Sequence, residues 1–181
     1  MIRGCYKYNS YSCNVGKGCS HKKPVRSSKI TLLGSGAILT EVIKAAQLLA
    51  AEGLDVDVFS VTSWSELARD GMACEKRASA TVRHEPVEGL GRAQPERAAV
   101  PFIAQQLASS HGPIIAATDY VRAVAESVRA YLPPGRQYTT LGTDGFGRSD
   151  TRAALREFFG VDAASIVRAA REAQAQSKPG E

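Results

Sequence analysis

One repeated pattern limits what this chain can fold into: a short apolar run, a glycine turn and then a helix. Residues 29–33 read as a buried strand, and Gly34-Ser35-Gly36 turns the chain into a segment with apolar residues at helical spacing up to Leu49. Gly53 stops that helix, and the alternating residues 55–61 form the next strand. This order predicts a βαβ unit with two parallel strands.

The pattern repeats further along the chain. Residues 113–117 read as a strand, Asp119 is expected to cap a helix that runs through Val128, and residues 137–141 read as another strand. Two more helices are expected, over 151–159 and 163–175, and residues 177–181 form a tail. The chain therefore predicts one α/β domain, over residues 29–176.

The positive charge of the chain is concentrated at its start. Residues 1–29 hold seven Lys or Arg and no Asp or Glu, whereas the whole chain has a net charge of +5, so the other residues sum to −2. The charge belongs to a basic arm, residues 1–28, and not to a nucleic-acid-binding fold. No apolar run approaches the ~20 residues that span a bilayer. No secretory signal is evident, so we expect a cytoplasmic location.

The cysteines do not predict a metal site. Cys5, Cys13 and Cys19 lie in the arm with His21, but their spacing lacks the close cysteine pair typical of zinc clusters. Reduced thiols are the favoured interpretation, because disulfides are rare in the cytosol. None of the histidines lies in a recognisable nucleophile motif.

The middle of the chain loses its periodicity. We expect Trp64 to pack over the sheet edge, with Ser63 or Ser65 capping a short turn over residues 66–68. Residues 75–100 scatter Arg and Glu among Pro and Gly, so an irregular loop is expected there.

An eight-residue loop follows the strand at 137–141 and is the candidate interface of the domain. It is expected to be rigid, with Arg148 paired to an acid and with Ser149 or Asp150 capping the helix at Thr151. A cation site is disfavoured by Arg148, and a kinase interpretation lacks its other motifs. The candidate contact residues are Thr143, Asp144, Phe146, Arg148, Ser149 and Asp150.

The Gly34-Ser35-Gly36 turn has two interpretations. Exposed N–H groups at such a strand-to-helix turn can hold a phosphate. The third glycine of a dinucleotide motif is missing, however, because position 39 is Leu39. Tight packing of the helix on the strand is therefore favoured over nucleotide binding.

Several motifs together resemble the C-terminal domain of the homodimeric bacterial pyruvate dehydrogenase E1 component. They are Leu32–Leu49, Val58–Gly71, Ala117–Tyr120 and Leu141–Phe159. The resemblance implies a transketolase C-terminal-like fold in three layers, with a mostly parallel sheet of about five strands and one antiparallel edge strand. Residues 4–8 resemble the entry strand of that family and are a possible edge strand.

The resemblance also implies what this chain lacks. The full enzyme decarboxylates pyruvate on thiamine diphosphate with magnesium and acetylates the lipoyl groups of E2. Its Gly-Asp-Gly motif, downstream Asn and activating Glu do not lie in this chain, so no catalytic, cofactor-binding or metal residue is assigned. The chain is interpreted as a fragment, inactive alone, with other E1 domains, a second E1 subunit and E2 as partners.

The alternative is a small binding module whose basic arm binds an acidic protein or nucleic acid. Nucleic acid is disfavoured, because the arm has few aromatic residues beyond Tyr6, Tyr8 and Tyr11.

Overall fold

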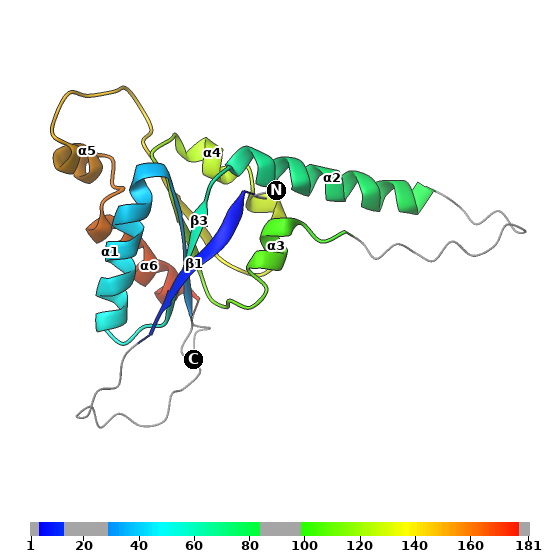
Figure 1. The fold of residues 1–181 in the computed structure, drawn as a ribbon, viewed down its shortest axis with the longest axis horizontal. Helices are drawn as coiled ribbons and strands as arrows, with labels where there is room; N and C mark the ends of the chain where they lie inside the picture. Colours follow the sequence, from blue (N-terminus) through cyan, green and yellow to red (C-terminus); the bar gives the residue numbers. More distant parts are fainter. Residues whose placement is uncertain (1–3, 13–28, 84–98, 178–181) are drawn as a thin grey trace, which may run out of the picture.

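The computed structural model describes residues 4–12, 29–83 and 99–177, which form a five-stranded sheet with helices on both faces (Figure 1). The strand order is β1-β3-β2-β4-β5, with β1 antiparallel to β3 and every other pair parallel. The strands are β1 (Cys5–Tyr11), β2 (Ile30–Ser35), β3 (Val56–Val61), β4 (Ile114–Ala117) and β5 (Tyr138–Leu141). The predicted mostly parallel sheet with one antiparallel edge strand is confirmed.

Two helical layers cover the sheet. Helices α1 and α6 pack on one face, and α2, α3 and α4 pack on the other (Figure 1). The helices are α1 (Leu39–Ala51), α2 (Trp64–Arg83), α3 (Phe102–Gln106), α4 (Arg122–Glu126), α5 (Arg152–Phe158) and α6 (Ala163–Gln176), with 3-10 turns η1 (Gly36–Ile38) and η2 (Arg129–Tyr131). The helices predicted over 151–159 and 163–175 are thus confirmed.

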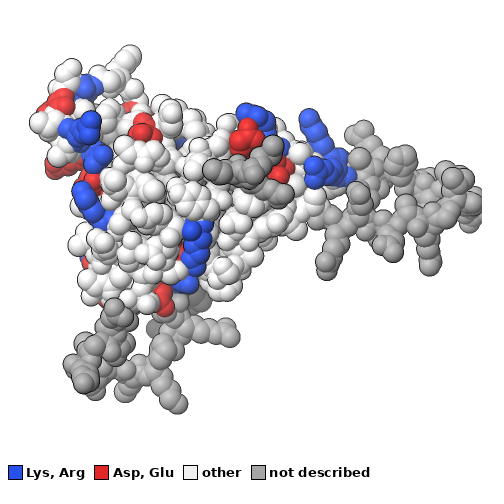
Figure 2. Space-filling view, viewed as in Figure 1, with Lys and Arg blue, Asp and Glu red and all other residues white. Residues whose placement is uncertain are grey.

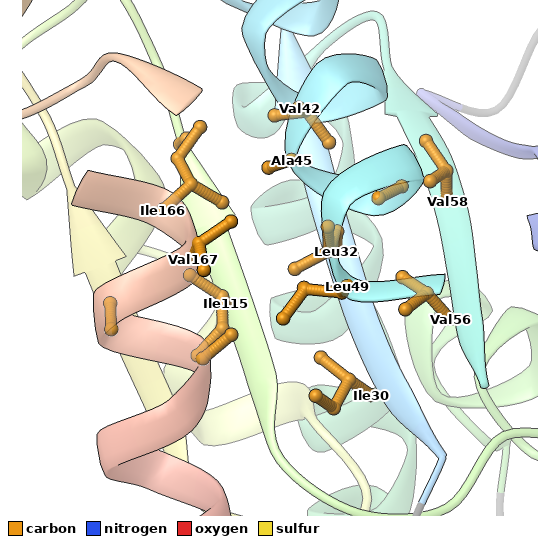
Figure 3. Close-up of a cluster of buried hydrophobic side chains, with 14 of the residues drawn as sticks. Ile30, Leu32, Val42, Ala45, Leu49, Val56, Val58, Ile115, Ile166 and Val167 are labelled. Atoms are coloured by element: carbon orange, nitrogen blue, oxygen red, sulfur yellow. The ribbon is translucent and has the colours of Figure 1, made fainter. Parts of the chain in front are cut away.

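Strand alternation builds the two cores. Leu32, Val58 and Ile115 point to the α1 and α6 face, where they meet Leu49 and Ile166 (Figure 3). The next residue of each strand points to the other core. Every residue of β2, β3 and β4 is buried, as expected for parallel strands covered on both faces.

The prediction of an irregular loop over residues 75–100 is wrong for its first part. Helix α2 continues to Arg83, and the turn over residues 66–68 is only its beginning. The predicted cap is confirmed, because the Ser63 hydroxyl accepts a hydrogen bond from the N–H of Glu66. Residues 75–79 are all exposed, and α2 runs past the sheet in Figure 1. Apolar periodicity stops there because this part of the helix has no sheet to cover.

Two further differences concern short helices. Residues 102–106 form α3, which the sequence analysis did not predict, and its Ile103 is buried. Asp119 does not cap α4, whose N-cap is Val121 without a side-chain cap. The N–H of Arg122 at the start of α4 is bonded to the Asp144 carboxylate instead, and the Asp119 carboxylate lies beside Gly36.

The start of the basic arm belongs to the sheet, and residues 13–28 lie outside the described part. The Cys5 side chain is buried, and its burial raises the pKa of the thiol to about 12. The thiol therefore stays protonated at neutral pH. Cys13, Cys19 and His21 lie outside the described residues. Charges of both signs are interspersed over the face in Figure 2.

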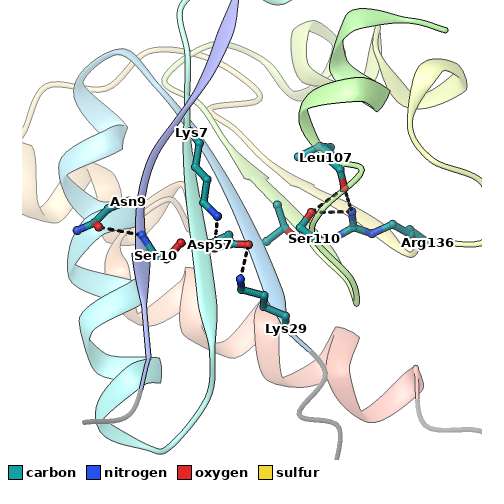
Figure 4. Close-up of polar contacts among 9 residues, drawn as sticks. Lys7, Asn9, Ser10, Lys29, Asp57, Leu107, Ser110 and Arg136 are labelled. Atoms are coloured by element: carbon teal, nitrogen blue, oxygen red, sulfur yellow. Dashed lines mark hydrogen bonds and ion pairs between the residues drawn. The ribbon is translucent and has the colours of Figure 1, made fainter.

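A buried carboxylate fastens β1 to the sheet. Asp57 on β3 accepts a hydrogen bond from the Ser10 hydroxyl at 2.6 Å and pairs with Lys7 and Lys29 at 2.9 and 3.0 Å (Figure 4). Burial favours the neutral carboxyl, but the Ser10 and lysine bonds outweigh it and lower the pKa of Asp57. The edge strand is thus held by charge as well as by its backbone ladder.

A partly buried arginine, Arg136, joins the amino end of β2 to the loop before β4. The Arg136 guanidinium donates to the carbonyl of Gly112 at 2.7 Å, the Ser110 hydroxyl at 3.0 Å and the Thr31 hydroxyl at 2.8 Å. Burial lowers the pKa of Arg136 to about 10, an effect that Asp57 opposes. The side chain is still charged at neutral pH.

We predict that Asp57→Asn lowers the free energy of unfolding by about 1–3 kcal/mol at pH 7, because an amide cannot balance two lysines. The folded pKa of Asp57 is lowered, so its stabilisation is present above the unfolded value of about 3.9 and is lost as the pH falls through the folded value. Urea unfolding at pH 7 and pH 3 measures both. The difference in stability between the two proteins should be smaller at pH 3 than at pH 7.

The control is Glu66→Gln, which removes an exposed ion pair with Arg69 and should change stability by less than about 0.5 kcal/mol. Equal stability of the wild type and Asp57→Asn at pH 7 would show that the cluster does not hold β1.

Candidate functional site

The carboxyl ends of the parallel strands all lie along one edge of the sheet. The connections that follow β2 and β4 turn there to opposite faces of the sheet. From β2 the chain enters α1 on one face, whereas from β4 it enters α4 on the other. In open α/β sheets, ligands and partners approach at this point between two strands. The Ser35 hydroxyl donates to the Thr118 hydroxyl at 2.8 Å and joins the ends of the two strands.

The Gly34-Ser35-Gly36 turn is shaped by close packing. A Cβ at Gly34 would lie 3.0 Å from side-chain atoms of Leu39 and Val42. Gly36 has a φ of +55°, and a Cβ there would lie 2.8 Å from the Asp119 carboxylate. That carboxylate would repel a phosphate at this turn, so the structure supports the packing interpretation.

The first part of the loop after β5 is tied to the turn after β4. The Thr143 hydroxyl donates to the carbonyl of Asp119 at 2.8 Å. Asp144 accepts a hydrogen bond from the N–H of Arg122 at 2.9 Å and pairs with the Arg122 guanidinium. The Arg122 N–H and then its guanidinium hold the pKa of Asp144 below its usual value. These contacts fix the first part of the loop, and the rigidity of the whole loop stays a prediction.

The second part of the loop differs from the prediction. Arg148 is not paired with an acid in the described residues, and its guanidinium lies over the ring of Phe158 at 4.1 Å. The cap of α5 is Thr151, whose hydroxyl accepts from the N–H of Ala154, so neither Ser149 nor Asp150 is the cap. The Asp144 carboxylate is already paired with Arg122, so it does not pair with Arg148, whose guanidinium packs on the Phe158 ring.

The loop exposes an aromatic patch. Phe146 is 96% exposed at the tip, and Tyr120, Val121 and Phe158 are also exposed at this edge. Buried aromatic residues and arginines are enriched in protein interfaces. The exposed side chains and Arg148 therefore form a surface suited to a protein partner, which we call the aromatic edge: Tyr120, Val121, Phe146, Arg148 and Phe158.

Helix α5 is held against α1 by a buried glutamate that the sequence analysis missed. The Glu41 carboxylate pairs with Arg156 at 2.7 Å and Lys44 at 2.9 Å, and accepts from the N–H of Ala163 at 3.3 Å. Burial favours the neutral carboxyl, but Lys44, Ala163 and Arg156 together lower the pKa of Glu41. The sequence signal that could have identified Glu41 is its position, because it places a charge in the apolar stripe between Ile38 and Val42.

A pocket of about 640 Å³ lies at the same edge, and we call it the switch-point pocket. It lies between η1, the loop after β5 and α5. It is lined by Ala37, Ile38, Asp119, Thr143, Gly145, Gly147, Arg148, Arg152, Leu155, Arg156, Phe159 and Val161.

Among the described residues, no group of three or more His, Cys, Asp or Glu is arranged to hold a metal ion. His111 is exposed in the loop before β4, and His21 and His84 lie outside the described residues. Burial raises the pKa of the Cys74 thiol, with Asp70 adding to the effect. None of the described helices has the length and apolarity needed to cross a membrane.

A family model described as the transketolase-like C-terminal domain matches residues 19–162. The pyruvate dehydrogenase E1 component of Mycobacterium tuberculosis is 41% identical over 177 residues, which cover 97% of this chain and 16% of that protein. The E1 component of Escherichia coli K12 is 45% identical over 159 residues, 86% of this chain and 16% of that protein. The chain thus spans about a sixth of the length of these relatives.

Solved structures show the same fold. Transketolase from Leishmania mexicana matches with a TM-score of 0.55 and 18% identity, over 98% of this chain and 19% of that one. A structure described as a split gene transketolase, an inactive beta4 tetramer, matches with a TM-score of 0.52 and 17% identity. The match covers 84% of this chain and 41% of that one. The resemblance and the fold stated from the sequence are confirmed.

We predict that Asp144→Ala loosens the loop after β5, because the Arg122 N–H and guanidinium lose their acceptor. Limited trypsin digestion followed by mass spectrometry should show cleavage after Arg148 several-fold faster than in the wild type. Cleavage after Arg69 in α2 is the internal control and should not change. An unchanged rate after Arg148 would mean that other contacts hold the loop.

Proposed function

The chain belongs to the family of transketolase-like C-terminal domains, and on that premise we propose that it serves as the C-terminal domain of a pyruvate dehydrogenase E1 component. Two E1 components that are 41% and 45% identical over most of the chain support this assignment. The chain spans only a sixth of their length, so the whole enzyme's activity would need the rest of that protein.

The role we propose is structural: the domain docks on the other E1 domains through the aromatic edge. The observation that carries it is the exposure of Phe146 on a loop whose base is fixed by Thr143 and Asp144. A rigid loop loses little conformational entropy on binding, and an exposed aromatic ring gains a large buried area. Two exposed rings near it, Tyr120 and Phe158, extend the same surface.

Thiamine diphosphate and magnesium would be held outside the described part of this chain. The Gly34-Ser35-Gly36 turn, which has the form of a phosphate site, faces the carboxylate of Asp119. The described residues contain no group of three or more His, Cys, Asp or Glu that could hold magnesium. We therefore assign the cofactor to the remaining E1 domains, and we propose E2 as the wider partner, in the cytoplasm. The contribution of this chain is to fix the loop after β5 at the surface that those domains would contact.

Complementation tests the proposal. The purified chain is mixed with Escherichia coli E1 lacking the segment that matches it, and thiamine-diphosphate-dependent decarboxylation of pyruvate is measured. We expect no activity from the chain alone and activity that rises on mixing. Activity of the chain alone would overturn the assignment of the cofactor to other domains, and failure of the mixture to gain activity would overturn the docking role.

The aromatic edge gives a sharper prediction. Phe146→Ala should raise the concentration of chain needed for half-maximal complementation at least about tenfold, because truncating a central interface residue costs about 1.4 kcal/mol or more. The matched control is Leu48→Ala, which removes an apolar side chain that is 51% exposed on α1. Equal effects of the two substitutions would show that binding does not depend on the loop.

A further inference from the structure

We propose that the switch-point pocket is a binding site for a small organic acid, with an apolar body and one carboxylate. The pocket lies where β2 and β4 send the chain to opposite faces of the sheet, which is the usual ligand position in open α/β folds. Its volume of about 640 Å³ lies within the range of small-molecule sites, roughly 300–1,000 Å³. This inference goes beyond the docking role, since it concerns binding by this chain alone.

The apolar part of the site is already formed. Ile38 and Val161 line the pocket and are 3% and 1% exposed, because they also belong to the core under α1 and α6. Leu155 and Phe159 line it from the side of α5 and are partly buried. Core packing therefore fixes much of the surface that would contact an apolar ligand, so little reorganisation is needed on binding.

Two arginines give the site its charge preference. Arg148 and Arg152 line the pocket, and neither makes an ion pair with a carboxylate within residues 4–12, 29–83 and 99–177. Arg156 also lines the pocket, but its charge is balanced by Glu41. The Arg148 guanidinium also lies over the Phe158 ring, but neither that contact nor any acid in the described residues neutralises its charge. A guanidinium binds a carboxylate through two parallel hydrogen bonds, so two guanidiniums without an ion pair at one pocket favour an organic anion.

One acid sets the orientation of the ligand. Asp119 lines the pocket from the side of β4, beside Gly36, whereas the arginines line it from the loop and α5. An anionic group is repelled from the Gly36 turn and attracted to Arg148 and Arg152. The ligand carboxylate would therefore face the loop and α5, and the apolar body would lie over Ile38.

The test is a titration of the full isotope-labelled chain with 3-phenylpropionate, followed by amide NMR shifts. We expect saturable shifts confined to residues 37–38, 119 and 143–161. The neutral analogue 3-phenylpropionamide should bind at least about tenfold more weakly, since it lacks the charge that the guanidiniums recognise. Shifts that do not saturate, that lie elsewhere or that the amide reproduces at equal affinity would overturn the proposal.

Substitutions and simple anions complete the test. Arg152→Gln should weaken 3-phenylpropionate binding about tenfold, the loss of roughly one charge-assisted pair. The control is Arg69→Gln on α2, whose arginine is likewise exposed and should leave binding unchanged. Acetate and inorganic phosphate separate an organic-acid site from a general anion site. Binding of either as tight as that of 3-phenylpropionate would overturn the proposed need for an apolar body.

Discussion

The complete burial of the three central strands, β2, β3 and β4, is the constraint on which the rest of this fold depends. Parallel strands are covered on both faces, so β2, β3 and β4 carry apolar residues in both directions and need a helical layer on each side. Both faces receive helices only if the connections that follow neighbouring strands turn to opposite faces of the sheet. The divergence between β2 and β4 follows from this requirement, and the candidate site lies at that divergence.

The carboxyl edge of the sheet combines fixed and exposed groups. Thr143 and Asp144 bind the loop to the turn after β4, and Glu41 holds α5 against α1. Phe146 projects from the surface between these two anchors. Such an edge can present a contact surface to another domain and still enclose a pocket beneath it, because the loop is held at both ends.

Buried charge is used at both ends of the sheet, and each charge is balanced locally. Asp57 is balanced by two lysines at the amino end, and Glu41 by Arg156 and Lys44 at the other. Removing one partner from a buried ion pair costs more than the pair itself contributes, because the remaining charge is left without compensation. These two carboxylates are therefore the polar positions at which substitution should most disturb the domain.

The sequence by itself determined the order of the strands, the helices α1, α5 and α6, the α/β class and the family. Each of these follows from local periodicity, turn residues or motifs a few residues long. Only the tertiary structure decided the length of α2, the partner of Arg148, the place of Asp119 and the role of Glu41. Those features depend on residues far apart in the chain: Glu41 meets Arg156, and Asp119 meets Gly36. Apolar periodicity indicates which face of a helix or strand is covered. It therefore cannot predict the part of α2 that extends past the sheet, nor a charged residue such as Glu41 that is buried by a partner far along the chain.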